Sequence, residues 1–270
     1  MNSADIKAAA RRFGADLVGI APIARFDGVP ESSDPRRVAP DTRSVITVGH
    51  RILRGAFRGI EEGTSFHNTY GCFGVNWSEA YFLAQTVHDL CHEIEETGAE
   101  AIPLLSREYE ANKFVPDYKF YAHACGLGSV GKGGFFLTPE YGHRQRFGFI
   151  FTTLELEGDS IIECDFCKDC NACIASCPFG AFNGSGDPDP EICRNCKNGM
   201  FDRPGSCDRL DRYASLCGRA CMTAVEKKIS NRFNAGFRKR SVWCLGRDGE
   251  ILVNSNQFVG GNCPDKFEGK

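Results

Sequence analysis

The apolar positions of residues 1–155 fall into short runs whose spacing predicts helices and strands in turn. Residues 6–14 predict a helix, because Gly14 is a usual C-terminal stop. Residues 77–97 carry apolar groups at helical spacing and predict an amphipathic helix. Apolar runs predict strands at residues 15–21, 44–49 and 147–154, with a further apolar segment at 101–105 and a loop at 22–40. This order is typical of an α/β or α+β domain with one sheet and helices against it, and we expect α+β.

The rest of the chain departs from this rhythm. Residues 114–153 are dense in glycine, and from 163 to about 225 cysteine, aspartate, glycine and proline dominate. We expect little regular structure there, because ligand bonds replace a large core. The tail predicts a β-hairpin around Asp248-Gly249. The expected domains are 1–160, 161–230 and a C-terminal extension at 231–270.

Composition and charge narrow the function classes. The chain has 270 residues, 42% of them hydrophobic, and a formal net charge of −3. A balance this close to neutral argues against nucleic acid and anionic membranes as partners. No run of 18 apolar residues or export signal is present, so we expect a cytoplasmic protein without a membrane-spanning helix.

Fifteen cysteines are the unusual feature, and most of them lie between Cys164 and Cys221. Clustered thiols in a reducing compartment are more often metal ligands than disulfides. Cys167-x2-Cys170-x2-Cys173-x3-Cys177-Pro178 has the spacing of the bacterial ferredoxin run, in which the fourth cysteine binds a neighbouring cluster. Zinc sites use two separated Cys-x2-Cys pairs instead. The run therefore predicts [4Fe–4S] clusters.

A second cluster needs more thiolates downstream, and the spacing predicts a crossed assignment. Cluster one takes Cys167, Cys170, Cys173 and Cys221, and cluster two takes Cys177, Cys207, Cys217 and one of Cys193 or Cys196. A single cluster with spare thiols remains the alternative. Cys164 is expected to be spare, although it could be a shifted first ligand. The five scattered cysteines, Cys72, Cys91, Cys125, Cys244 and Cys263, are expected to be small buried apolar residues.

Residues 121–148 hold the second motif, a glycine-rich stretch. Gly126-x-Gly128-x-x-Gly131 matches a dinucleotide-binding pattern, but no strand is predicted before it and no acidic residue follows at the required distance. Together with His123-Ala124-Cys125, Thr138-Pro139-Glu140-Tyr141-Gly142 and the Cys167–Pro178 run, this stretch resembles the epoxyqueuosine reductase and reductive dehalogenase superfamily.

The resemblance implies a nitroreductase-like, corrinoid-binding domain followed by a ferredoxin-like domain with two [4Fe–4S] clusters. Base-off cobalamin would lie between the two domains and receive electrons from an external donor such as ferredoxin or flavodoxin. The residues expected to hold it are Gly126, Gly128, Gly131, Lys132, Gly133 and Thr138, because glycines let the backbone approach a ligand. The alternative is that these glycines only permit a sharp turn.

A corrinoid reductase also needs a proton donor and an anion-binding group. Tyr121 and His123 precede the glycine stretch and are the candidate donors, and Arg144 is the candidate anion ligand because guanidinium offers a planar fork. The alternative for each ring is a packed side chain with a satisfied polar tip. The chain lacks the long C-terminal portion of epoxyqueuosine reductases and the twin-arginine signal of respiratory dehalogenases, so we expect neither substrate to apply.

These observations predict an oxygen-sensitive oxidoreductase that relays electrons through two [4Fe–4S] clusters to cobalt and reduces a small molecule. Two alternatives remain open. One is a non-catalytic iron–sulfur electron carrier with a degenerate pocket, and the other is a minimal epoxyqueuosine reductase that acts on tRNA. The substrate, the electron donor and the oligomeric state do not follow from the residues.

Overall fold

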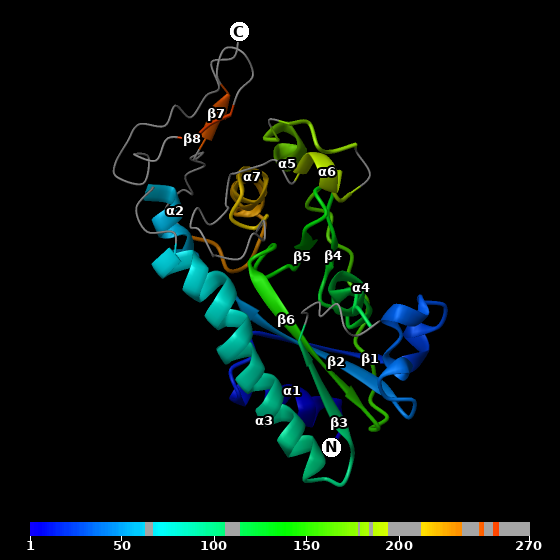
Figure 1. Ribbon diagram of the computed structural model, residues 1–270. Coiled ribbons are helices and arrows are strands. Elements are labelled where there is room, and N and C mark those ends of the chain that lie inside the picture. Colours follow the sequence, from blue (N-terminus) through cyan, green and yellow to red (C-terminus); the bar gives the residue numbers. More distant parts are fainter. Residues whose placement is uncertain are drawn as a thin grey trace. The chain divides into compact units, whose positions relative to one another are not determined.

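The computed structural model describes residues 1–62, 67–105, 114–177, 179–183, 186–193, 212–233, 243–245 and 251–253 (Figure 1). The chain divides into two compact units, each discontinuous in sequence, whereas the sequence analysis divided it linearly. The first unit comprises Met1–Arg51, Asn76–Ser129 and Gln145–Cys164, and the second comprises Ile52–Val75, Val130–Arg144 and Asp165–Lys270. Within the described residues, no helix is both long and apolar enough to cross a bilayer.

A four-stranded sheet forms the centre of the first unit, in the order β1-β2-β6-β3. Its strands are β1 (Leu17–Pro22), β2 (Ser44–Arg51), β3 (Ala101–Leu105) and β6 (Gln145–Thr152). All three neighbouring pairs are antiparallel. The predicted strands are therefore confirmed to within a few residues, and the mixture of helices with an antiparallel sheet is α+β.

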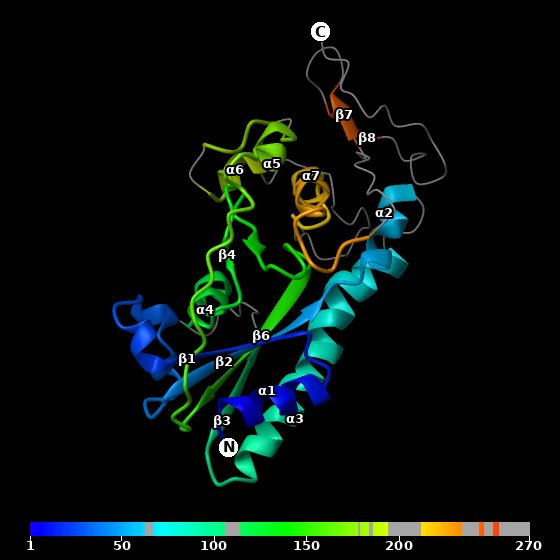
Figure 2. The same ribbon diagram turned by 180° about the vertical axis from the view of Figure 1, so that it is seen from behind.

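Helices cover both faces of this sheet (Figures 1 and 2). Helices α1 (Ser3–Arg12) and α3 (Ala84–Glu95) pack on one face, in a core that includes Ile46 and Ile150. Helix α4 (Tyr118–Ala124) lies on the other face, where the Tyr121 ring contacts Phe149 and Phe151. Successive strand residues point to opposite faces, so one apolar strand serves both layers.

Local signals account for the helix boundaries. Asn2 caps α1 and accepts hydrogen bonds from the backbone of Ala4 and Asp5, and Gly14 follows the helix with a φ of 99°. The predicted helix at 77–97 is confirmed, but its first part, η6 (Ser78–Leu83), has wider π-type turns. The segment just before it, η5 (His67–Asn76), has the same turns, and α3 follows η6.

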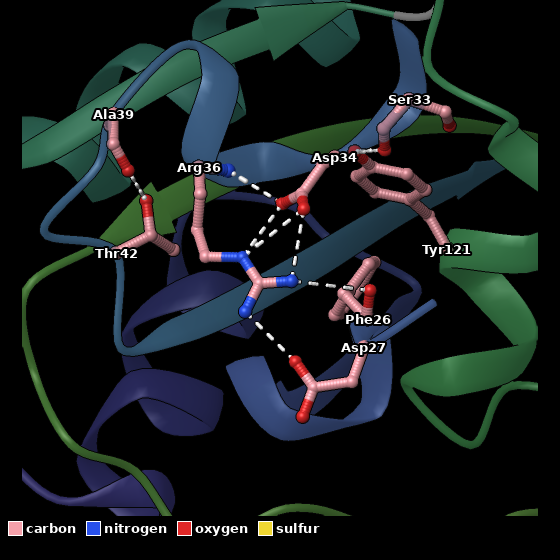
Figure 3. Close-up of polar contacts among 8 residues, drawn as sticks. All are labelled: Phe26, Asp27, Ser33, Asp34, Arg36, Ala39, Thr42 and Tyr121. Atoms are coloured by element: carbon pink, nitrogen blue, oxygen red, sulfur yellow. Dashed lines mark hydrogen bonds and ion pairs between the residues drawn. The ribbon is translucent and has the colours of Figure 1, made fainter. Parts of the chain in front are cut away.

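The loop at 22–40 contains three short 3₁₀ segments, η1 (Ile23–Phe26), η2 (Glu31–Ser33) and η3 (Pro35–Arg37). Arg36 holds these segments together, since its guanidinium group donates to both carboxylate oxygens of Asp34 and to Asp27 (Figure 3). The hydrogen bond from Arg36 lowers the pKa of Asp34 below its usual value.

The second unit has little regular structure, as the composition predicted. Its elements are η4 (Arg54–Phe57), α2 (Arg58–Glu62), β5 (Phe136–Leu137), α5 (Ala172–Ala175), α6 (Pro190–Cys193) and α7 (Leu216–Val225), and β5 pairs with β4 (Ser129–Val130). A small apolar core joins Ile52, Phe57 and Tyr70 to Ala214 and Met222. In the tail, β7 (Trp243–Leu245) and β8 (Ile251–Val253) pair antiparallel, as the predicted hairpin requires. Residues 246–250, including Asp248-Gly249, lie outside the described residues.

Candidate metal centre

Two short helices of the second unit present cysteines to one another. The loop before α5 turns tightly, with the Cys170 amide donating to the Cys167 carbonyl, and Cys173 lies on α5 itself. Helix α7 carries Cys217 and Cys221, which lie about one turn apart and therefore share a face. Because α5 packs against α7, thiols that are distant in sequence come together.

Cys221 lies among thiols of both expected clusters. Its side chain is buried, and burial raises its pKa well above the usual value, with smaller increases from the thiols of Cys173, Cys167, Cys170 and Cys217. Helix α7, which carries Cys221, packs against α5, which carries Cys173. Because Cys217 of the other expected group is also among these neighbours, the division of the thiols between two clusters stays a prediction.

A second group of thiols lines a cavity nearby in the same unit. Cys177, Cys193 and Cys217 surround it with Phe179, Phe182, Ala181, Pro188 and Leu216, and it encloses about 370 Å³, part of it open to solvent. Burial raises the pKa of Cys193, and Cys217 and Cys177 raise it further. These are three of the ligands expected for cluster two. Cys196 and Cys207 lie outside the described residues, so the fourth ligand stays a prediction.

Both thiol groups suit an iron–sulfur cluster better than a single ion. In the part of the chain that the structure describes, no three His, Cys, Asp or Glu side chains converge as the ligands of one metal ion would. The four thiolates of a cubane bind four different irons, so their sulfur atoms do not need to meet at one point. The two groups, in which Cys173 and Cys221 are buried and the other described thiols are partly exposed, are compatible with clusters.

The glycine stretch lies directly against the cysteine loop. A Cβ built on Gly131 would stand 2.8 Å from the sulfur of Cys167, and one on Gly133 would stand 2.6 Å from the sulfur of Cys173. Between these glycines, Lys132 donates from Nζ to the Lys168 carbonyl at 3.2 Å and to Asn171 Oδ1 at 3.4 Å. Glycine suits 131 and 133 because the backbone passes close to the sulfurs of Cys167 and Cys173.

The remaining residues expected to hold a cofactor also have contacts within the chain. Gly126 has a φ of 74°, and a Cβ there would collide with the Ser160 carbonyl. The Gly128 carbonyl accepts a hydrogen bond from His123. Thr138 is buried and forms the turn that ends at Gly142. The packing of the chain accounts for these residues without a corrinoid, and their role in binding one stays a prediction.

Tyr121, the first candidate proton donor, is buried on α4 and donates from its hydroxyl to the Ser33 carbonyl at 2.7 Å (Figure 3). Burial raises its pKa above the usual value, which keeps the hydroxyl protonated. The bond ties α4 to the loop at 22–40. This is the packed ring with a satisfied tip that the sequence analysis held as the alternative, and its catalytic role is untested.

His123 faces a different part of the first unit. Its Nδ1 donates to the Gly128 carbonyl at 2.8 Å, which leaves Nε2 directed at the carboxylate of Glu163, 3.5 Å away. The side chain of His123 is 29% exposed, so it retains access to solvent. The sequence analysis did not single out Glu163, because no motif spacing links it to His123.

Arg144 is buried in the second unit, where its guanidinium group donates to the carbonyl of Ile52 at 3.1 Å and to the carbonyl of Asn231 at 2.8 Å. These bonds join three segments of that unit. The three catalytic candidates thus have separate surroundings: Tyr121 lies against the sheet, His123 beside Glu163, and Arg144 among backbone carbonyls. Their catalytic roles stay predictions.

Curated proteins with similar sequences are reductases of two kinds. An epoxyqueuosine reductase of Staphylococcus aureus is 33% identical over 167 residues, which are 60% of this chain and 41% of that protein. One of Gloeobacter violaceus is 28% identical over 203 residues, covering 66% and 60%. A tetrachloroethene reductive dehalogenase of Desulfitobacterium hafniense is 34% identical over 138 residues, covering 43% and 25%. The chain is a homologue of both groups of reductases. It spans less than two thirds of the length of each of these three proteins, and no protein-family model matches it.

Solved structures of the same two groups of reductases share this fold. An epoxyqueuosine reductase from Streptococcus thermophilus matches 87% of this chain and 64% of its own, with a TM-score of 0.57 and 18% identity. A reductive dehalogenase solved in connection with B12-dependent dehalogenation matches 85% of this chain and 32% of its own, with a TM-score of 0.55 and 20% identity. The resemblance drawn from the glycine and cysteine motifs is therefore confirmed, and at these identities the structures establish a shared fold.

One expectation is contradicted by these relatives. The net charge argued against nucleic acid as a partner, yet the homologues include epoxyqueuosine reductases, the group whose substrate is carried on tRNA. The inference was wrong because net charge is a sum over the whole chain. It does not report how basic groups are distributed on the surface.

Proposed function

We propose that this chain is an iron–sulfur oxidoreductase in which two [4Fe–4S] clusters relay single electrons from an external donor toward a substrate. The observation that carries the proposal is the packing of α7, which carries Cys217 and Cys221, against α5, which carries Cys173. A helix residue some fifty positions downstream completes the thiol set, as crossed ligation of two adjacent clusters requires. The homologues are reductases, which supports an enzymatic role.

The second unit would be the ferredoxin-like domain, and the first unit would be the nitroreductase-like domain. Ligation by cysteine alone suits low-potential clusters, because four thiolates leave the centre rich in electrons. One electron at a time would enter from a small protein such as a ferredoxin or flavodoxin, which is oxidised by one electron at each step. The thiols of Cys173 and Cys221 are buried, and apolar side chains line the cavity beside Cys177, Cys193 and Cys217.

A corrinoid is proposed as the acceptor after the clusters, on the strength of the relatives rather than of the glycine stretch. One fold relative is a reductive dehalogenase associated with B12-dependent dehalogenation. When bound, such a group supplies a strongly reducing metal centre. The glycines at 126, 131 and 133 face this chain's own atoms, so the corrinoid step is tested separately from the clusters.

Elemental analysis of one anaerobically purified sample tests both parts. Two clusters predict equal amounts of iron and inorganic sulfide, about eight of each per chain, and zinc in their place would end the proposal. Reconstitution with cobalamin followed by desalting then shows whether cobalt is retained at one per chain. Clusters without retained cobalt would favour the electron carrier over the corrinoid reductase.

The second candidate function is reduction of epoxyqueuosine in tRNA, with a core shorter than that of the relatives. It is favoured by the repeated occurrence of epoxyqueuosine reductases among the curated homologues. An electrophoretic shift assay at low salt with tRNA-Tyr carrying epoxyqueuosine tests binding, and unmodified tRNA is the control. A reduced small molecule in the absence of any tRNA shift would favour the first candidate.

A further inference from the structure

Arg212 bridges the glycine stretch and the second thiol group. Its Nη2 donates to the Gly133 carbonyl, and its Nη1 lies 3.1 Å from Asp187 Oδ1. The guanidinium group also stacks on the Phe135 ring, with its central carbon 4.6 Å from the ring centre. Two hydrogen bonds and a stacked ring define both the position and the plane of the cation.

This position lies beside both expected clusters. Gly133, which Arg212 holds through its carbonyl, is the residue whose Cβ would stand 2.6 Å from the Cys173 sulfur. On its other side the guanidinium group is 5.7 Å from the Phe182 ring, and Phe182 lines the cavity with Cys177, Cys193 and Cys217. The side chain is only 19% exposed, so solvent screens its charge weakly.

We propose that Arg212 is a positioning residue that raises the reduction potential of cluster two. A [4Fe–4S] cluster becomes more negative by one charge when it accepts an electron. A fixed cation nearby therefore stabilises the reduced form more than the oxidised form, and the effect is strengthened by low local polarity. Arginine suits the role because it stays protonated at every accessible pH. The influence of Arg212 on the thiol of Cys193, whose pKa it lowers, is consistent with this proximity.

The negative charge of Asp187 partly cancels the positive charge of Arg212. Its carboxylate binds the guanidinium group but is 59% exposed, whereas Arg212 is mostly enclosed, so solvent screens the anion more than the cation. The pair of Arg212 and Asp187 therefore makes a net positive contribution at cluster two. Removing the charge of Asp187 should act in the opposite direction to removing that of Arg212, which makes the proposal testable with two variants of opposite sign.

A redox titration of the anaerobic protein, followed by electron paramagnetic resonance, measures the midpoint potential of each cluster. Arg212→Gln should shift the midpoint of cluster two to a more negative value, and that of cluster one in the same direction, because Arg212 also binds Gly133 beside the Cys173 sulfur. Asp187→Asn should shift the midpoint of cluster two to a more positive value. Arg212→Lys retains the charge and should remain close to wild type. Lys227→Gln removes one positive charge from an exposed side chain of the same unit and should change neither midpoint.

The inference rests on the proposed function, and the two fail in different ways. A wild-type chain without two clusters refutes the proposed function. Two clusters whose midpoints are unaffected by Arg212→Gln refute only the role of Arg212. If Arg212→Gln fails to assemble cluster two, Arg212→Lys decides the matter: an unchanged midpoint supports the electrostatic role, and a negative shift with full iron content overturns it.

Discussion

Arg54 places two guanidinium nitrogens on the two carboxylate oxygens of Glu61, at 2.9 and 2.7 Å, and Glu61 has no exposed surface. The pair joins η4 to α2 beside the small apolar core of the second unit. A bidentate pair of this kind satisfies both charges within the protein. It is therefore costly to disrupt by removing only one partner.

Glu61→Gln is expected to lower the free energy of unfolding by about 3–5 kcal/mol, because the buried guanidinium group of Arg54 loses its counter-charge. Chemical denaturation of the cluster-loaded protein measures the change. The matched control is Glu31→Gln, which breaks the pair of Arg37 with a carboxylate that is 85% exposed. That change should stay below about 0.5 kcal/mol. Equal losses of unfolding free energy in the two variants would contradict the burial of the Arg54–Glu61 pair.

Gly133→Ala is expected to remove cluster one or prevent its assembly, because the new methyl group would stand 2.6 Å from the Cys173 sulfur. Iron should fall by about half, since one of two clusters is lost. Gly55→Ala is the control, because a Cβ at Gly55 meets no atom within 4 Å. Full iron content in both variants would show that the glycine stretch does not cover the cluster.

Cys221→Ser should likewise remove about half of the iron, because a serine hydroxyl is a poor substitute for a thiolate ligand. Cys164→Ser should leave the iron unchanged. Cys164 lies in the first unit, where its amide donates to Ser129 Oγ at 2.8 Å, and it is the expected spare. Loss of iron in Cys164→Ser with full iron in Cys221→Ser would reverse the two assignments.

The first unit should lose stability in mild acid, because burial disfavours protonation of the His50 ring in the folded protein. Burial lowers the pKa of His50, with a smaller opposing effect from Asp16. Its Nε2 lies 2.8 Å from Thr86 Oγ1, whose proton goes to the Phe13 carbonyl. Nε2–H is therefore the donor.

The unfolded chain binds the proton more readily, so the stability that neutral His50 contributes is present above its unfolded pKa of about 6.5. It is lost as the pH falls below that value toward the lower folded pKa. Urea denaturation at a series of pH values should show this loss in the wild type and a flatter profile in His50→Gln. Identical profiles would exclude His50 as the source.

The sequence by itself determined the strands and the expectation of iron–sulfur chemistry. The run from Cys167 to Cys177 predicts iron–sulfur clusters because ligand spacing is set by a local loop, and the strands at 44–49 and 147–154 followed from local apolar runs. Cys91 and Cys125 are buried, as expected for small apolar residues. Local spacing is sufficient wherever the physical constraint acts over a few neighbouring residues.

Only the tertiary structure decided which distant residues meet. It brought Cys221 to the first three thiols, set Gly131 and Gly133 over the cysteine sulfurs, and placed Arg212 between Gly133 and Asp187. It also gave Tyr121 and Arg144 backbone carbonyls as partners. None of these contacts leaves a periodic or spaced pattern in the chain. They depend on how α5, α7 and the glycine stretch pack, and that packing is a property of the whole second unit.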